Sequence, residues 1–196
     1  MQRMTGNRRT APRSAPGLAG RRRVGFALCA TLLGAVWPFG QALARHVVRL
    51  WPEGRPAPPL DLVDLDGTRW TIDALAGQVV VLNFWATWCE PCRVEMPSLE
   101  AMAARRRREG VVVFAVNYLE APEKIRRFLE RAPFKPPILL DSDGDATVAW
   151  TPRVFPSTVL VGRDGRPATT VVGELDWGAA EASALLGPLI AVARRT

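Results

Sequence analysis

The chain has 196 residues, which is enough for one folded domain and some additional sequence. Its apolar content of 48% suits a globular core, and its formal net charge is +7. The charge is concentrated at one end. Residues 1–44 hold seven of the 26 basic residues and no acidic residue, which leaves 19 basic and 19 acidic residues from position 45 onward. Because the remainder is formally neutral, the net charge does not indicate a nucleic-acid-binding protein.

Residues 1–44 have the composition of an export signal. Arg21-Arg22-Arg23 ends a basic segment, residues 24–39 are uncharged and mostly apolar, and Ala42-Leu43-Ala44 is a small-x-small cleavage pattern. The apolar run is shorter than the roughly 20 residues of a full membrane span. We expect either a cleaved signal peptide or a retained signal anchor, with the arginines in the cytoplasm and the body of the chain outside.

Two weaker interpretations of the same segment exist. Arg22-Arg23 resembles a twin-arginine signal, but the following Val24-Gly25-Phe26 fits that pattern poorly. Cys29 is a conceivable lipidation site, but the preceding Leu28 is bulky where a small residue is expected. The simpler interpretation treats Cys29 as an ordinary apolar residue of the signal.

Residues 45–59 are rich in proline and predict an extended linker, and residues 60–196 predict the folded domain. The short apolar run Val79–Leu82 is typical of a strand covered on both faces. The predicted elements are a hairpin over 60–72, strands over 78–85, 111–116 and 137–140, helices over 91–108 and 122–132, a helical turn before 150, strands over 157–161 and 168–173, and a helix over 177–193. Strands that alternate with helices and end in a hairpin predict an α/β fold, with a central mixed sheet flanked by helices.

Outside the signal, the chain has two cysteines, both in the motif Trp88-Cys89-Glu90-Pro91-Cys92. Two cysteines cannot form a disulfide scaffold, and they cannot close a tetrahedral zinc site without two further ligands. The only histidine, His46, is far from the pair in sequence and is interpreted as a solvated linker residue. Redox chemistry of the two thiols remains, and neither a metal nor a cofactor is expected.

The motif lies at a predicted junction of strand and helix. Cys89 would then stand at the helix N-terminus, where free backbone N–H groups and the macrodipole favour a thiolate. Cys89 is the expected attacking thiolate and Cys92 the resolving thiol of a mixed-disulfide reaction. Pro91 suits the first helical turn, where no backbone donor is needed. Glu95, three residues after Cys92, is a candidate proton carrier for the buried thiol or an exposed carboxylate at the helix N-terminus.

The segment from Asn83 to Pro97 resembles the active-site segment of the TlpA/ResA/CcmG group, which are membrane-tethered or periplasmic thioredoxin-like reductases. The resemblance covers about residues 55–193, and it implies a thioredoxin-like fold with an N-terminal hairpin and a central insertion, supplied here by residues 119–137. It also implies a cis-proline that faces the disulfide and pairs with the substrate backbone. Phe155-Pro156-Ser157-Thr158 matches that position, so Pro156 joins the candidate residues.

The resemblance also assigns supporting roles. Thioredoxins proper usually have a buried aspartate where this chain has Asn83, so the buried acid role would pass to Glu95. Val154 stands where many relatives have glycine, and Phe155 is bulky for its place beside the site, which leaves the choice of partner open. The candidate catalytic residues are Cys89, Cys92, Glu95 and Pro156, and the supporting residues are Trp88, Glu90, Pro91 and Asn83.

The resemblance implies a reductase of cysteine pairs in exported proteins, either apocytochrome c haem-attachment thiols or thiols of a copper-receiving protein. Its electrons would come from a membrane donor of the CcdA/DsbD type, and the chain would meet the membrane only through its N-terminal segment. The negative charge of Glu90 would destabilise a nearby cysteine thiolate and would therefore favour a reducing protein over an oxidising one. A change of about 30 mV in the reduction potential corresponds to about 1.4 kcal/mol, so one such charge can shift the potential but does not set it alone.

Two other functions fit less well. A thioredoxin-fold peroxidase would need a threonine three residues before the reactive cysteine, and Thr87 is two residues before Cys89. A copper chaperone would need a histidine ligand beside the two thiols, and the chain has only His46.

Two charged runs do not indicate binding sites. Arg105–Arg108 closes a predicted helix, where cations complement the dipole. Asp141, Asp143 and Asp145 have the spacing of a calcium loop, but Pro152 stands where the distal glutamate is required, so a capped turn is expected.

Overall fold

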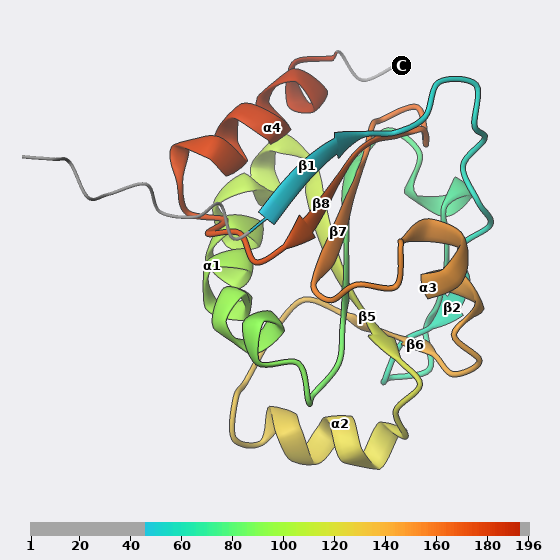
Figure 1. The fold of residues 1–196 in the computed structure, drawn as a ribbon, viewed down its shortest axis with the longest axis vertical. Helices are drawn as coiled ribbons and strands as arrows, with labels where there is room; N and C mark the ends of the chain where they lie inside the picture. The colour runs from blue at the N-terminus through green and yellow to red at the C-terminus, as the bar shows by residue number, and fades with distance from the viewer. Residues whose placement is uncertain (1–45, 193–196) are drawn as a thin grey trace, which may run out of the picture. The chain divides into compact units, whose positions relative to one another are not determined.

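The computed structural model describes residues 46–192 (Figure 1). The expected signal or anchor over residues 1–44, with Cys29 and Arg22-Arg23, lies outside the described residues. The elements are β1 (His46–Leu50), β2 (Asp61–Val63), β3 (Arg69–Thr71), β4 (Val79–Trp85), α1 (Glu90–Arg106), β5 (Val111–Tyr118), α2 (Pro122–Leu129), β6 (Ile138–Asp141), α3 (Asp145–Trp150), β7 (Ser157–Val161), β8 (Pro167–Gly173) and α4 (Ala180–Ala191). Between His46 and Val192, no helix is long and apolar enough to cross a membrane.

Six strands form one mixed sheet in the order β1-β8-β7-β4-β5-β6. The central strand β4 pairs in parallel with β5 and antiparallel with β7, and β6 continues the parallel half. Strands β2 and β3 form a separate antiparallel hairpin. The predicted α/β fold with a mixed sheet and an N-terminal hairpin is therefore confirmed, and α2 lies within the expected insertion between β5 and β6.

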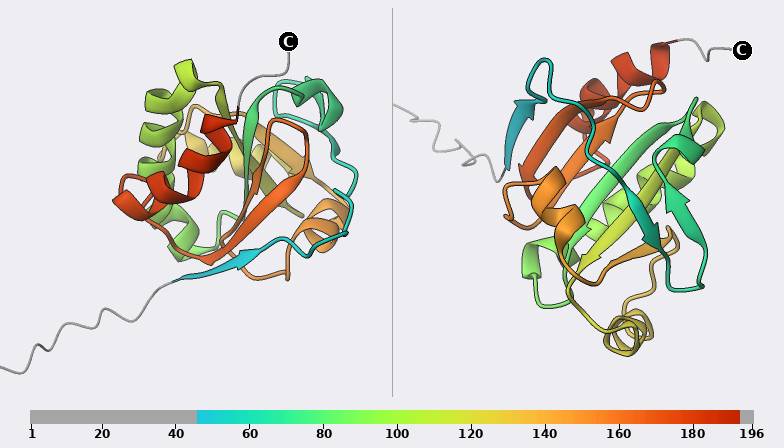
Figure 2. Two further views of the ribbon diagram at one scale, coloured as in Figure 1. Left: turned by 90° about the horizontal axis from the view of Figure 1, so that it is seen from above. Right: turned by 90° about the vertical axis from the view of Figure 1, so that its right-hand side faces the viewer.

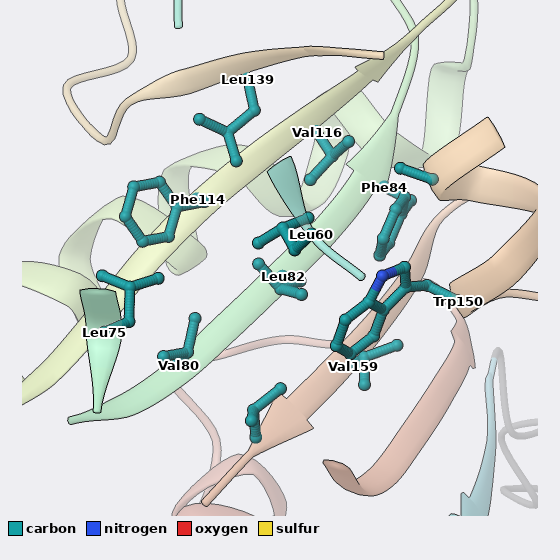
Figure 3. Packing of buried hydrophobic residues seen from close by; sticks show 12 residues of the cluster. Leu60, Leu75, Val80, Leu82, Phe84, Phe114, Val116, Leu139, Trp150 and Val159 are labelled. Carbon is teal, nitrogen blue, oxygen red and sulfur yellow. The ribbon is translucent and has the colours of Figure 1, made fainter. Parts of the chain in front are cut away.

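The sheet has an apolar cluster on each face because side chains alternate along a strand. Val80, Leu82 and Phe84 of β4 pack with Trp150 of α3 in one cluster (Figure 3). Val79 and Val81 face the opposite cluster, which includes α1 and α4 residues such as Leu99 and Leu186. Figure 2 shows α1 and α4 on one face of the sheet, with α3 and the β2–β3 hairpin on the other. Both faces of β4 are covered, as its continuous apolar sequence predicts.

The N-terminal part of the expected linker forms a strand. Residues 46–50 form β1, which pairs antiparallel with β8, and the backbone N–H of Trp51 still donates to the Ala168 carbonyl of β8 over 2.8 Å. Backbone pairing gives β8 a second neighbour and makes β1 the edge of the sheet. His46, interpreted as a solvated linker residue, lies 2.8 Å from the carboxylate of Glu181 and connects β1 to α4.

The acidic run that begins at the last residue of β6 caps a helix, as the sequence predicts. Asp141 is fully buried, and its carboxylate accepts hydrogen bonds from the backbone N–H groups of Ala146 and Thr147 and from the Thr147 hydroxyl. These donors lie in the first turn of α3, where backbone N–H groups have no partner within the helix. The carboxylate of Asp141 is therefore used for capping.

Candidate active site

The two cysteines are joined by a disulfide at the start of α1. The loop between β4 and α1 ends at Cys89, which is the N-cap of the helix, and the Cys92 N–H donates to the Cys89 sulfur over 3.3 Å. Cys92 is completely buried, whereas Cys89 keeps 5% of its surface exposed. Pro91 occupies the first turn of the helix, as the sequence predicts. Of the two cysteines, only the one at the helix N-terminus keeps any exposed surface.

An apolar cluster lies behind the disulfide. Both cysteines pack with Trp85 at the end of β4, Met96 of α1 and Phe128 of α2. The ring centroids of Trp85 and Phe128 are 5.4 Å apart. The insertion that carries α2 therefore closes the buried side of the site and excludes water from Cys92.

The expected electrostatic effect of Glu90 is offset in the structure. Glu90 forms an ion pair with Arg93 one turn further along α1, and both side chains are partly exposed. The negative charge near Cys89 therefore has a nearby positive partner, which the sequence argument for Glu90 left out. Exposed pairs of this kind contribute roughly 0 to 1 kcal/mol. We expect Glu90→Gln to change the reduction potential little.

Pro156 lies beside the end of β4, the strand that leads to the motif. The Phe155–Pro156 peptide bond is cis. The β4–β7 register pairs Phe84 with Ser157, which places Pro156 next to the last residue of β4. The Pro156 carbonyl accepts a hydrogen bond from Gly173 of β8. The cis bond that the resemblance implies is present, at the same end of the sheet as the disulfide.

Glu95 and Asn83 form a buried polar network on the α1 side of the sheet. The Asn83 amide donates to one carboxylate oxygen of Glu95 over 2.6 Å, and the backbone N–H of Leu175 donates to the other over 3.1 Å. The Asn83 amide also donates to the Thr158 hydroxyl on β7. Glu95 is 2% exposed, so the alternative of an exposed helix carboxylate is wrong.

The pKa of Glu95 is raised from its ordinary value of 4.5 to about 7, chiefly by burial and to a smaller extent by the charge of Glu174. The donors Leu175 and Asn83 partly oppose this rise because they stabilise the carboxylate. The Trp177 indole acts in the same direction, although its Nε1 has no hydrogen-bond partner of ordinary geometry. Glu95 can therefore hold or release a proton near neutral pH, one helical turn from Cys92.

Glu120 is a buried acid that the sequence analysis did not identify. It follows β5, and its carboxylate accepts from the backbone N–H and the hydroxyl of Thr87, at 2.7 and 2.6 Å. The Asn117 amide and the Lys124 ammonium complete its contacts, at 2.9 and 2.7 Å. Burial raises the pKa of Glu120, but these donors outweigh it and hold the pKa below its ordinary value. Glu120 thus anchors the loop that leads to Cys89.

We expect Glu120→Gln to destabilise the protein by about 1.5–3 kcal/mol, because hydrogen bonds to a charged group are lost and the amide nitrogen faces other donors. Lys124→Met is the matched control. Lys124 is half-exposed and its removal leaves the other three donors in place, so its effect should stay below about 1 kcal/mol. Urea unfolding at pH 7 measures both. Equal effects of the two substitutions would contradict the anchoring role.

Trp88 is an exposed aromatic residue next to the disulfide. Its ring meets Phe155 edge-on, with centroids 5.8 Å apart, and Phe155 contacts Tyr118 at 5.3 Å. These three aromatic residues come from three different loops or strand ends. Their contacts bring the motif, the cis-proline loop and the end of β5 together.

The alternative functions gain no support from the geometry. The hydroxyl of Thr87 donates to Glu120 and is thus engaged away from Cys89. Among residues 46–192, no three His, Cys, Asp or Glu side chains gather in a way that could hold a metal ion.

The comparisons with known proteins agree with this geometry. The model of the AhpC/TSA family matches residues 54–166, which include the disulfide and the cis-proline. The chain belongs to the AhpC/TSA family. It is a thioredoxin-fold thiol-disulfide oxidoreductase similar to the TlpA, ResA and CcmG group. It is 33% identical over 123 residues to the thiol-disulfide oxidoreductase ResA of Bacillus subtilis, covering 63% of this chain and 69% of that protein.

Solved structures show the same fold. A candidate thiol:disulfide interchange protein DsbE from Chlorobium tepidum has 26% identity and a TM-score of 0.64, over 70% of this oxidoreductase and 96% of that chain. A candidate thioredoxin from Neisseria meningitidis has 28% identity and a TM-score of 0.61, over 68% and 88% of the two chains. The resemblance that the motif indicates is therefore confirmed at the level of family, fold and reaction class.

Proposed function

We propose that this oxidoreductase is a reductase of specific cysteine pairs in exported proteins, with Cys89 as the attacking thiolate and Cys92 as the resolving thiol. The disulfide at the N-terminus of α1, in which Cys89 keeps a small exposed surface and Cys92 keeps none, carries the proposal. A partner can reach Cys89 but not Cys92. The helix N-terminus favours the thiolate form at that position.

The reaction balances as a two-electron exchange. In the reduced protein, the Cys89 thiolate attacks one sulfur of the partner's disulfide, which forms a mixed disulfide and releases the partner's other sulfur as a thiolate. The Cys92 thiolate then attacks the Cys89 sulfur, which restores the internal disulfide and releases the second partner thiolate. The partner gains two electrons and, after protonation of its thiolates, two protons.

Glu95 and Pro156 have supporting roles in this proposal. Cys92 must lose its proton to act as the resolving thiolate, although it is buried among apolar side chains. Glu95, with a pKa of about 7 and one helical turn away, can accept that proton when it is ionised. Pro156, in the loop beside the end of β4, would contact the partner's backbone next to its cysteine.

The turnover requires an electron donor because each cycle leaves the cysteines oxidised. The basic and apolar composition of residues 1–44 supports export, either with a cleaved signal or with a retained anchor. Outside the cytoplasm the electrons must cross the membrane, so the proposed donor is a membrane protein of the CcdA/DsbD type. The proposed substrates are the oxidised forms of two kinds of cysteine pair, the haem-attachment thiols of apocytochrome c or the thiols of a copper-receiving protein.

The direction of the reaction is tested by the reduction potential. Equilibration of the protein in thiol buffers of defined potential should give a value nearer to about −270 mV, as in a reducing thioredoxin, than to about −120 mV, as in an oxidising protein. The protein reduced beforehand with dithiothreitol should reduce insulin disulfides. A value near −120 mV would identify an oxidant and contradict the reductase proposal. Glu90→Gln serves as a control, with an expected shift below about 30 mV because Arg93 already compensates the charge.

A further inference from the structure

A groove of about 580 Å³ lies along the first half of β5, and residues 111–114 form its floor. One wall comes from α1 and the turn after it, with Ala104 and Arg107. The other wall comes from β3, where Trp70 packs on Phe114 with ring centroids 4.8 Å apart. Because β4 and β5 are parallel and the disulfide follows β4, the groove and the disulfide lie at opposite ends of these strands.

The strand edge at the bottom of this groove has no neighbouring strand among the described residues. β6 pairs with β5 from Ala115 onward, where the Ala115 N–H donates to the Pro137 carbonyl over 3.0 Å. Alternate residues of a parallel strand direct their backbone groups to the same side, so Val111 and Val113 also face this edge. The next bond would join the Val113 carbonyl to the N–H of residue 137, which is a proline and has none. Pro137 therefore ends the ladder and leaves the edge of β5 open.

The open backbone groups lie in a buried part of the molecule. Val111 is 2% and Val113 4% exposed. Within residues 46–192, no backbone or side-chain group bonds to the N–H or the carbonyl of Val113 on the open side. Buried backbone groups nearly always have a hydrogen-bond partner. An added extended strand would supply both a donor and an acceptor at this position.

The rim of the groove carries a positive charge without a partner. Lys135 lies on the rim, and its ammonium is 3.5 Å from the carboxylate of Glu100. Arg107 is exposed on the opposite wall, and no carboxylate of residues 46–192 forms an ion pair with it. The groove therefore favours a ligand that brings a negative charge to Arg107.

We propose that this groove binds an extended acidic segment of a partner protein, which adds to β5 as a further strand. The backbone of the segment bonds to Val111 and Val113, its apolar side chains pack against Trp70, and a carboxylate pairs with Arg107. The partner can stay bound whether the cysteines are oxidised or reduced, because the groove is at the far end of the strand from Cys89. This contact goes beyond the proposed disulfide exchange and does not depend on it.

Binding is measured with eight-residue peptides of alternating valine and serine, in which one serine at a time is replaced by aspartate. Titration into isotope-labelled protein should shift the amide signals of Val111 and Val113 in nuclear magnetic resonance spectra. The best aspartate peptide should bind about threefold to fivefold more tightly than its asparagine counterpart, as expected for one partly exposed ion pair. The bound peptide should also slow hydrogen exchange of the Val113 amide, which gains an acceptor.

Arg107→Glu should weaken the best aspartate peptide roughly 5-fold or more, because repulsion replaces attraction. Arg108→Glu is the matched control, since Arg108 is the next residue, is also exposed and does not line the groove. Its affinity for the peptide should equal that of the wild type. Both substitutions are on the surface, and the melting temperature verifies that the variants fold. Cys89→Ala should bind the peptide as well as the wild type does.

The inference is overturned if no peptide causes saturable shifts at Val111 and Val113 at about 1 mM, the weakest affinity that the proposal allows. Shifts confined to the loops around Trp88 would also overturn it, because the peptide would then bind beside the disulfide. Equal weakening by Arg107→Glu and Arg108→Glu would show that the net charge of the protein, and not the groove, attracts the peptide. Insulin reduction tests the proposed function separately, and its outcome does not alter these readings.

Discussion

The Cys92→Ala variant is expected to accumulate a partner protein bound to Cys89 through a mixed disulfide, while Cys89→Ala accumulates none. Removal of Cys92 leaves the first attack possible and eliminates the thiol that resolves the intermediate. Removal of Cys89 leaves only a sulfur that is completely buried and cannot meet a partner. Turnover of insulin should fall by about 10³-fold or more in both variants, because each lacks a reacting group.

The intermediate is detected after acid quenching, which protonates the remaining thiols and stops exchange, followed by electrophoresis without reductant and mass spectrometry. The wild-type protein is the control and should show little trapped partner. A partner trapped on Cys92 in the Cys89→Ala variant would reverse the assigned roles. Absence of trapping in both variants, together with no insulin reduction by the wild-type protein, would contradict the catalytic interpretation of the pair.

Glu95→Gln is expected to remove a pH dependence of stability. The pKa of Glu95 is about 7 in the folded protein against 4.5 without burial, so the folded state holds the proton more tightly. Stability from this group is therefore fully present below pH 4.5 and is lost as the pH rises through 7. A shift of this size corresponds to about 3 kcal/mol, since one pKa unit is about 1.4 kcal/mol. The glutamine variant has no carboxyl proton to lose.

Urea unfolding of the oxidised protein at pH 5 and pH 8 measures the effect. The stability of the wild type relative to Glu95→Gln should fall by about 2–3 kcal/mol between these pH values. Glu123→Gln, on the exposed surface of α2, is the matched control and should show no such change. The rate of insulin reduction, plotted against pH, should show a step near pH 7 in the wild type and in Glu123→Gln. This step should be absent in Glu95→Gln. A constant difference in stability between wild type and Glu95→Gln would show that Glu95 does not titrate in this range.

The reaction class was predictable because its determinants are local. The C-x-x-C spacing, the apolar strand before it and the helical pattern after it lie within about thirty residues, and together they determine where Cys89 stands. The pairing of Glu90 with Arg93 is also local and could have been predicted from the three-residue spacing on a helix. Pro156 was found through the resemblance to a family, since a single proline carries no local indication of what it faces.

The contacts that complete the site depend on the tertiary structure. Leu175 donates to Glu95 across 80 residues of sequence, and Glu120 binds Thr87 across 33. Residues 46–50 have a strand partner only because β8 passes beside them, which no local pattern indicates. Burial in turn decides chemistry, since the pKa of Glu95 rises only when the surrounding sheet and helices remove water from it.

The amino-acid sequence by itself thus determined the redox pair Cys89 and Cys92 and its position at a helix N-terminus, because spacing and periodicity are properties of neighbouring residues. The tertiary structure alone decided which acid is buried, which acid anchors the loop before Cys89, and which apolar side chains pack behind the disulfide. Those properties arise when distant segments meet and exclude water. The result is a disulfide with one slightly exposed cysteine and, one helical turn away, a buried carboxyl whose pKa is raised to about 7.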